Sequence, residues 1–403
     1  VECVIIATEW DSLIASLLTD KLDLVVGSMA ITEQRSRAVR FSDPYYESGA
    51  RLFVRAGARE PQSNGFAVGV TLGTTFEKVV TEHFPRAELR VYKGDTDILQ
   101  DLMSGRLDGM VTDELVGGYV AKKRGALVTT TGERLIEERM GIPMKPGRDA
   151  LLAQVNRAVG ALRASGKQRA LLDRHLNARA APAAGESSLV ETATPLLLRG
   201  FVATVLLCIL GIGLGLVLAL LLAWAALSKG FIAKPTAVLI DFVRSTPFVI
   251  QLFALYFGPP AIGFTPSAMN AGVAAIAIHS AAYIAEVVKS SFRAVPDGQR
   301  IAATSLGLSP WQSLRYVVGP QMLPIAAVPT LNTVVAMIKD SAVVSVIGVY
   351  ELTLQTQRII SSSFRPIELY ACAAGLYFLL TFPLLLWGRR LERVWRTRGL
   401  LHG

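Results

Sequence analysis

Apolar residues are distributed very differently in the two halves of the chain. From residue 195 onward, long runs of leucine, valine, alanine and isoleucine are separated by short polar stretches, whereas earlier apolar runs are short and alternate with charged segments. A membrane-spanning helix needs about 20 predominantly apolar residues, and only the second half has such runs. The small, Pro-bearing stretch ARAAPAAGESS lies between the halves. The pattern therefore predicts a soluble domain over 1–177, a linker over 178–194 and a membrane domain over 195–398.

The C-terminal half contains five apolar segments long enough to cross a bilayer. They are Leu196–Leu227, Ala237–Phe257, Ala268–Val288, Tyr316–Ile338 and Ile367–Trp387. The Gly-Pro-Pro stretch 258–260 ends the second segment, and Pro320, Pro324 and Pro329 are expected to interrupt the fourth. We therefore expect an all-α transmembrane bundle of five helices.

Positive residues indicate which end of each span faces the cytoplasm. Five arginines follow the fifth span, at positions 389, 390, 393, 396 and 398, whereas the stretch 258–270 after the second span carries no charge. Lys and Arg are enriched on the cytoplasmic side of membrane proteins. The sequence therefore predicts a multi-pass protein of the cytoplasmic membrane with a cytoplasmic C-terminus. Because five is an odd number of spans, the N-terminal domain is expected to be extracytoplasmic.

Composition agrees with this division and excludes other classes of protein. The 403-residue chain is 51% hydrophobic and carries a formal net charge of +9. Residues 1–186 contain 25 Lys+Arg and 24 Asp+Glu, whereas residues 187–403 contain 16 and 8, so the net charges are +1 and +8. The positive charge thus accompanies the apolar spans, and no nucleic-acid partner is expected. Three cysteines and four scattered histidines predict neither a disulfide framework nor a metal site.

One pattern occurs twice in the soluble half, 85 residues apart. LLTDKLDLVVGS spans Leu17–Ser28 and LMSGRLDGMVTD spans Leu102–Asp113. Each copy predicts a helix, a polar turn and a short apolar strand that ends on a polar residue. Helices that alternate with short strands indicate an α/β fold with parallel strands, and two copies indicate two lobes.

The chain is expected to cross between the two lobes twice. We place lobe 1 at about 1–57 and 146–177, and lobe 2 at about 58–145. The hinge strands, where the chain passes between the lobes, are then expected near Phe53–Arg59 and Gly141–Pro146.

Polar residues after the predicted strands form a candidate binding site. Ligands of open α/β sheets bind beyond the carboxyl ends of the strands, where Ser28 and Asp113 fall. Thr32 is expected to cap a short helix whose first turn carries Arg35. Arg35 offers two parallel hydrogen bonds to a carboxylate, and Asp113 offers an acceptor to an ammonium group. Together they predict a site for a free α-amino acid.

A second helix start lies in lobe 2. Val68–Leu72 is a predicted strand, after which the sequence GTTFE predicts a helix with a capping box from Thr74 to Glu77. The free N–H groups of a helix N-terminus attract anions. Taken alone, Thr74 is better explained as a cap, and an isolated Arg or Asp as a surface residue. The joint occurrence of Arg35 and Asp113 in a duplicated scaffold is what favours binding.

Both halves resemble known transport proteins. Residues 1–177 resemble an extracytoplasmic solute-binding protein for polar amino acids, through LDLVVGSMAITEQR, RFSDPYY, LGTTFE and RLDGMVTDE. Residues 195–398 resemble the permease subunit of an ATP-binding-cassette (ABC) importer, through FVRSTPFVIQLFALYFG, AAYIAEVV, GQRIAATSLGLSPWQSLRYVVGPQ and LNTVVAMIKDSAVVSVIGVYEL. The resemblance implies an α/β two-lobed periplasmic-binding-protein-like (type II) domain followed by an all-α transmembrane bundle.

The resemblance also implies a function and site residues. The binding domain would trap an amino acid between its lobes and deliver it to the permease for uptake across the bacterial cytoplasmic membrane. The implied substrate-binding residues, with Asp113 on the ammonium and the others around the carboxylate, are Ser28, Met29, Ala30, Arg35, Thr74, Thr75 and Asp113. Ala30 stands where related proteins often have Ser or Thr, which removes a hydroxyl.

A loop in the second half resembles the segment that docks on a cytosolic ATPase. It runs from Gln299 to Pro320, with Ala302, Ala303 and Gly307 at matching positions. Ile301 replaces the Glu that is usual there. The implied partners are a cytosolic ABC ATPase dimer and a second permease copy, most simply as a homodimer, with a heterodimer as the alternative.

The chain itself is not expected to be an enzyme or to bind a cofactor. The phosphate-loop-like sequence GALRASGKQ has five residues between its glycines and lacks the Ser or Thr that binds Mg²⁺. ATP and Mg²⁺ would therefore be used by the partner ATPase. No Ser/His/Asp, Cys/His or paired-carboxylate set is recognisable, which disfavours an enzyme on the same fold.

Two alternatives use the same amino-acid-binding domain. In ligand-gated channels that share this binding domain, the pore segments are inserted within the sequence of the domain. In this chain, residues 1–177 contain no such insertion. A membrane sensor needs a cytoplasmic effector, whereas only 16 residues follow Trp387.

A further expectation concerns the binding pocket. Related proteins begin with a strand and a helix that supply an aromatic wall. We therefore expect Val1 not to be the functional start, and the pocket to lack one side.

Overall fold

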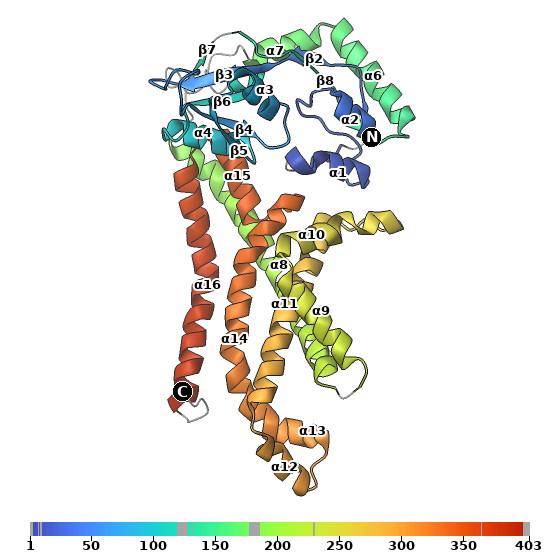
Figure 1. The fold of residues 1–403 in the computed structure, drawn as a ribbon, viewed down its shortest axis with the longest axis vertical. Coiled ribbons are helices and arrows are strands. Elements are labelled where there is room, and N and C mark those ends of the chain that lie inside the picture. The colour runs from blue at the N-terminus through green and yellow to red at the C-terminus, as the bar shows by residue number, and fades with distance from the viewer. Residues whose placement is uncertain are drawn as a thin grey trace. The chain divides into compact units, whose positions relative to one another are not determined.

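The structure is a computed structural model that describes residues 3–6, 8, 10–118, 128–131, 133–176, 186–228, 230–363 and 365–397. These residues form two compact units, Val1–Glu191 and Thr192–Gly403. The first unit is α/β and the second is helical (Figure 1). Residues 178–185 of the predicted linker lie outside the described residues, and its remaining part, 186–194, belongs to a helix.

A five-stranded mixed sheet forms the core of the second lobe, in the order β5-β4-β6-β3-β7. β4 runs parallel to β5 and β6, as the α/β pattern predicts, whereas β3 runs antiparallel to β6 and β7. Every residue of β4 and β6 is buried, which is typical of strands covered on both faces. The elements are β3 (Ala50–Arg55), β4 (Ala67–Thr71), α3 (Phe76–His83), β5 (Glu88–Tyr92), α4 (Asp95–Met103), β6 (Gly109–Asp113) and β7 (Val128–Thr131).

The first lobe has little sheet. Its core contains Leu13, Leu17, Val25, Met29 and Val39. β1 pairs with β9 and β2 pairs with β8, both antiparallel. The elements are η1 (Trp10–Ser12), α1 (Leu13–Leu18), α2 (Glu33–Ala38), β1 (Arg40–Phe41), β2 (Tyr46–Ser48), β8 (Glu138–Met140), β9 (Pro143–Met144), α6 (Asp149–Ala164) and α7 (Lys167–Leu176).

The two copies of the repeated pattern do not fold alike. The second copy ends in β6, as predicted, but the first forms only an isolated bridge between Leu24 and Met144. A strand needs a hydrogen-bonded neighbour along its length, whereas this segment contacts β9 through the Leu24–Met144 bridge and the Val25 amide alone among its described backbone groups. The predicted strand that ends at Ser28 is therefore wrong.

The chain enters the five-stranded sheet earlier than the sequence indicates. β3 begins at Ala50, eight positions before the expected start of lobe 2 at residue 58. Phe53, placed in a hinge by the sequence, is fully buried inside β3. The two lobes are instead connected by the β2–β8 ribbon, in which Ser48 pairs with Glu138. Gly49 joins this ribbon to β3, where a Cβ would clash with the Ile136 carbonyl oxygen, so any larger residue would require the backbone to shift.

The helices α6 and α7 return to the first lobe. Asn156 Oδ1 accepts a hydrogen bond from the Asp43 amide at 2.9 Å, and Arg163 Nη2 donates to the Pro44 carbonyl at 2.5 Å. Gln168 donates to the Tyr45 carbonyl. Gly166, with φ +67°, separates the two helices.

The helical unit contains four described helices that are long and apolar enough to cross a membrane, within Ala193–Leu227, Ala268–Ala294, Pro310–Ile347 and Pro366–Thr397. Two further helices, Ala233–Ser245 and Phe248–Ile262, pass the same test only together and are bent by 106°. The elements are α8 (Glu186–Leu227), α9 (Ala233–Ser245), α10 (Phe248–Phe257), η3 (Pro259–Ile262), α11 (Ala268–Ala294), α12 (Asp297–Ser305), α13 (Pro310–Ser313), the π-helical turn η4 (Leu314–Val318), α14 (Gly319–Asp340), η5 (Ser341–Ile347), α15 (Leu352–Ser363) and α16 (Pro366–Thr397).

The predicted second span is therefore not one helix. α10 turns sharply away from α9 (Figure 1), and the break lies at Thr246 and Pro247. Pro247 lacks an amide N–H, and a residue before proline prefers an extended conformation, which Thr246 adopts with φ −103° and ψ 134°. The five expected spans correspond to the four helices plus this bent pair.

The predicted interruption of the fourth span is also wrong. Pro320 lies in the first turn of α14, directly after the π-helical turn η4. Pro324 and Pro329 lie inside the helix, which continues to Asp340. Neighbouring helices and side chains compensate for such prolines in membrane helices.

Glycines in α8 allow this helix to approach α11 closely. A Cβ at Gly211 would lie 2.7 Å from Ile276 of α11.

Candidate functional site

A cavity of about 300 Å³ lies between the two lobes of the N-terminal unit. Its wall joins residues after the first repeat copy with the ends of β4 and β6 and the start of α3. Six of the seven predicted substrate-binding residues line it: Ser28, Ala30, Arg35, Thr74, Thr75 and Asp113. Met29 does not, because its side chain is buried in the core of the first lobe.

Arg35 is held by local helix chemistry, as the sequence predicts. Thr32 caps α2, and its hydroxyl accepts a hydrogen bond from the Arg35 amide at 3.2 Å. The Arg35 guanidinium donates to the Ala30 carbonyl at 3.1 Å and to the Gly73 carbonyl at 3.0 Å. Burial lowers the pKa of Arg35, and Glu138 opposes that shift. Since the normal pKa of arginine exceeds 12, this side chain remains a cation fixed in the cavity wall.

Trp10 supplies an aromatic wall that sequence reasoning missed. It lines the cavity, its Nε1 donates to the Gly73 carbonyl at 3.4 Å, and the Arg35 guanidinium lies 5.9 Å from its ring centre. Trp10 therefore gives the cavity an aromatic residue from within the chain, and the expectation that the pocket lacks one side stays a prediction. The sequence offered one usable signal for this role: Trp10 begins the short helix η1, which directly precedes α1 at the start of the first lobe.

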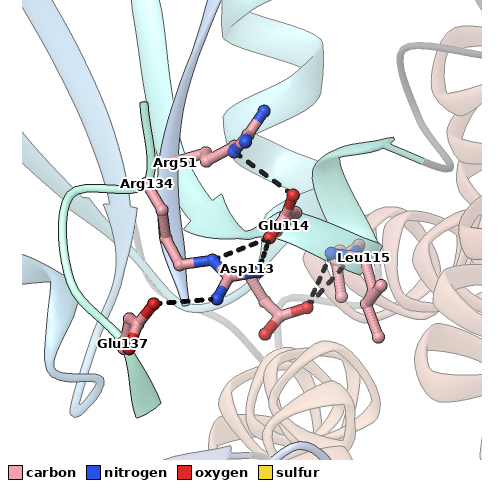
Figure 2. A network of polar contacts seen from close by, with 7 residues as sticks. Arg51, Asp113, Glu114, Leu115, Arg134 and Glu137 are labelled. Atoms are coloured by element: carbon pink, nitrogen blue, oxygen red, sulfur yellow. Dashed lines mark hydrogen bonds and ion pairs between the residues drawn. The ribbon is translucent and has the colours of Figure 1, made fainter. Parts of the chain in front are cut away.

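Asp113 ends β6 with a carboxylate whose two oxygens have different surroundings. Oδ1 accepts hydrogen bonds from the Leu115 amide at 2.9 Å and the Val116 amide at 3.4 Å (Figure 2). Oδ2 is buried, since Asp113 is only 3% exposed, and it has no hydrogen-bond partner among the described residues. A buried carboxylate oxygen without a donor is costly unless a ligand supplies one.

An ion-pair network fixes the chain directly after Asp113. Glu114 lies between Arg51, at 3.3 Å, and Arg134, at 2.6 Å (Figure 2). The Glu114 amide also donates to the Gly49 carbonyl at 2.8 Å. The hydrogen bond to Glu114 raises the pKa of Arg134. This network ties the end of β6 to β3 and to the segment that leads back to the first lobe.

The start of α3 differs in detail from the predicted capping box. The helix begins at Phe76, one residue later than expected, and Thr75 takes the cap position without capping through its side chain. Thr74 Oγ1 accepts from the Phe76 amide at 3.4 Å, whereas Glu77 accepts from the Gly73 amide at 3.2 Å. Thr75 instead lines the cavity with Glu138, and its hydroxyl lowers the pKa of that carboxylate.

Three further charged residues line the cavity and were not found from the sequence: Lys93, Asp95 and Glu138. Asp95 accepts from the Thr71 hydroxyl at 2.5 Å and from the Thr112 hydroxyl at 3.2 Å. Burial raises the pKa of Asp95, although these hydrogen bonds oppose the shift. Each of these carboxylates comes from a different element, so no local sequence pattern joins them.

The predicted ATPase-docking loop folds into α12, α13 and the turn η4, at one end of the helical unit between α11 and α14 (Figure 1). Gln299, Ala302, Gly307 and Pro320 are at its surface, whereas Ala303 is buried. Gly307 ends α12 with φ +74°. Exposed apolar side chains are also present, with Leu306 81% and Trp311 69% exposed. Exposed apolar side chains on this loop are compatible with a protein interface.

Family models match both halves of the chain. Residues 1–178 match the bacterial extracellular solute-binding proteins, family 3, and residues 188–397 match the binding-protein-dependent transport system inner membrane component. The second match covers more than half of the chain. The chain belongs to this permease family.

Individual relatives agree for each half. The glutamine transport system permease protein GlnP of Escherichia coli is 39% identical over 210 residues, 51% of this chain and 95% of that protein. The probable amino-acid ABC transporter permease protein YckA of Bacillus subtilis is 36% identical over 185 residues, 46% and 82% of the two chains. The L-cystine-binding protein TcyJ of E. coli is 30% identical over 183 residues, 44% and 69% of the chains. A solved structure described as an amino acid ABC transporter with histidines is 34% identical, covers 52% of this chain and 98% of its own, and has a TM-score of 0.48.

The permease is thus a solute-binding domain fused to the transmembrane subunit of an ABC importer. It is an inner-membrane protein that works with an ATPase partner in a membrane complex. Both matched families are transport proteins rather than enzymes, so ATP hydrolysis belongs to the separate ATPase subunit.

Proposed function

We propose that this permease takes up a free amino acid, which its binding domain captures between Arg35 and Asp113. The observation that carries the proposal is the buried Asp113 Oδ2, which lines the same cavity as a fixed guanidinium and lacks a donor among the described residues. An α-amino acid presents one ammonium and one carboxylate a few ångströms apart, and so complements both groups. The names of GlnP and YckA, which refer to glutamine and amino-acid transport, support this substrate class.

The other wall residues have defined roles in this proposal. The unengaged N–H groups of Arg35 and the start of α3 at Thr74 and Thr75 would hold the ligand carboxylate. Ser28 would stand beside it, oriented by Tyr46, whose hydroxyl donates to Ser28 Oγ at 2.6 Å. Trp10 would cover the ligand's apolar surface.

Calorimetric titration of the twenty amino acids into the detergent-purified full chain tests the substrate class. Saturable binding of a few related amino acids is the expected result. A folded chain, as judged by circular dichroism, that binds none of them would contradict the proposal. Uptake into vesicles that contain the permease and its ATPase, driven by ATP, would extend the result from binding to transport.

The proposed orientation places the binding domain outside the cytoplasm and the C-terminus inside. The match of 1–178 to extracellular proteins and the arginines at the end of α16 support it. Cys3 is exposed and provides a probe. In a chain with Cys208→Ala and Cys372→Ala, a membrane-impermeant maleimide should label Cys3 in spheroplasts. A cysteine introduced by Trp311→Cys in a Cys3→Ala version should react only after permeabilisation, and the reverse pattern would refute the orientation.

The proposed assembly is two copies of this chain bound to an ATPase dimer, which uses ATP and Mg²⁺. The exposed apolar side chains of α12 and α13 support their role in docking. Native mass spectrometry of the co-purified complex tests the stoichiometry. Two permease chains of equal mass are expected, whereas one copy beside a different permease subunit would favour a heterodimer.

A further inference from the structure

A carboxylate of the protein itself lies beside the subsite assigned to the ligand carboxylate. Glu138 begins β8, and its half-buried side chain lines the cavity between the lobes. Thr75 and Arg35 line this cavity and the adjoining hollow together with Glu138, and both lower the pKa of its carboxylate. The two groups that would hold a ligand carboxylate therefore already interact with Glu138.

We propose that Glu138 competes with the ligand carboxylate for Thr75 and Arg35, so that binding requires this side chain to give up Thr75 or to take up a proton. The inference rests on the proposed function, because it assumes an amino-acid carboxylate at Arg35. Two ionised carboxylates in one site repel each other, which costs free energy. One of them therefore tends to bind a proton. Glu138 would therefore set the affinity for every amino acid rather than choose among them.

The charges around Glu138 determine the direction of this effect. Arg35 on α2 and Asp113 at the end of β6 face it across the cavity, which Lys93 and Asp95 also line. Lys78 and Glu82 of α3 line an adjoining hollow and pair with each other at 3.6 Å, so their charges largely cancel. Burial and Asp113 raise the pKa of Glu138, and Thr75 and Arg35 lower it.

A bound carboxylate would take over the two stabilising partners of the ionised form. The pKa of Glu138 would then be higher in the complex than in the free protein. Binding would take up a proton, and affinity would increase as the pH falls toward the pKa of Glu138.

Proton uptake by the wild-type chain is the first test. The full chain is titrated with L-glutamine, L-cystine and L-arginine in buffers of different ionisation enthalpy, between about pH 5 and about pH 8. The expected result is uptake of part of a proton per ligand and tighter binding at acid pH. Binding that is independent of pH and of the buffer's ionisation enthalpy would overturn the proposal.

A matched pair of variants assigns the effect to Glu138. Glu138→Gln removes the competing charge, so it should bind about tenfold more tightly near neutral pH, without proton uptake. The neighbouring Glu137→Gln is the control, since Glu137 is 86% exposed and pairs with Arg134 at 3.5 Å. It should behave as the wild type does.

The outcomes separate this inference from the proposed function. Unchanged or weaker binding by E138Q would overturn the role of Glu138 and leave the amino-acid site intact. No saturable binding by the wild-type chain would overturn the proposed function, and this inference with it.

Discussion

Arg134 forms an ion pair with Glu114 at 2.6 Å, immediately after the proposed ammonium-binding residue Asp113 (Figure 2). Arg51 approaches the same carboxylate at 3.3 Å from β3. The pair therefore joins the end of β6 to the two places where the chain crosses between the lobes. Because Asp113 Oδ1 is already held by two amides, a shift of this turn would move Oδ2 away from the cavity.

Loss of the ion pair should weaken ligand binding without unfolding the domain. Glu114→Gln keeps the shape of the side chain but removes the charge that both arginines contact. We expect a loss of affinity of about threefold to tenfold, since a partly exposed pair contributes about 1 kcal/mol. Calorimetry with a double-mutant cycle on Glu114→Gln and Arg134→Gln measures the coupling. Additive effects would show that the pair does not position Asp113.

Arg35→Ala should abolish measurable binding of amino acids. The guanidinium is the only cation fixed by two described backbone contacts in the cavity wall, and a hydrogen bond to a charged ligand group contributes about 1.5–3 kcal/mol. Arg37→Ala is a matched control, since Arg37 lies on the same helix, is 78% exposed and pairs with Glu33. Near-normal affinity of Arg35→Ala in calorimetry would refute the carboxylate site.

Asp113→Asn should lower affinity by about tenfold to a hundredfold. The asparagine oxygen can still accept from the amides of Leu115 and Val116, so the local turn is preserved. The asparagine NH₂ group would take the place of Asp113 Oδ2, so the ligand ammonium would meet a donor instead of an acceptor. The same variant should not improve binding of N-acetylated amino acids, which lack that charge. Equal affinity of wild type and variant for the free amino acid would contradict the assignment.

Gly307→Ala should impair transport while leaving ligand affinity unchanged. Gly307 adopts φ +74° at the end of α12, which costs an alanine about 1–2 kcal/mol, although a Cβ there would meet no atom within 4 Å. The strain would distort the surface that the ATPase is proposed to contact. ATP hydrolysis stimulated by substrate in proteoliposomes is the measurement, with Gly298→Ala, also free of contacts and without a positive φ, as the control. Weakened amino-acid binding would argue against a docking role.

The ion pairs of Asp20 should make the first lobe less stable in acid. The hydrogen bond from Lys145, at 2.5 Å, followed by that from Arg148, lowers the pKa of Asp20. A lowered pKa gives stability that is present above the unfolded value of about 3.9 and is lost as the pH falls through the folded value.

Asp20→Asn should therefore destabilise the lobe by up to about 1 kcal/mol near neutral pH and by less in acid. Hydrogen exchange of wild type and variant, compared at the same pH, measures the difference. Asp23→Asn is the control, because Asp23 is 78% exposed and lies 3.9 Å from Arg148. A difference for Asp20→Asn that persists below about pH 3 would contradict the assignment.

The sequence was informative where the chemistry is local. Thr32 and Arg35 lie within one helical turn, and the pattern that ends at Asp113 forms a helix and a strand as predicted. Glu138 was missed because its position depends on the register of β8 with β2, about ninety residues earlier in the chain. The bend at Pro247 was missed because the apolar residues before and after it together have the length of one span, although the polar residues 244–246 and the proline were a usable signal.

The exposed apolar side chains of α12 and α13 have a practical consequence for handling the protein. Leu306 and Trp311 project from the loop that is proposed to meet the ATPase. In the proposed orientation, a chain made in excess of that partner would expose these apolar side chains to the cytosol, where they would favour self-association. Balanced synthesis of the two subunits would therefore protect the permease, and co-expression should give a more homogeneous preparation than expression of the chain alone.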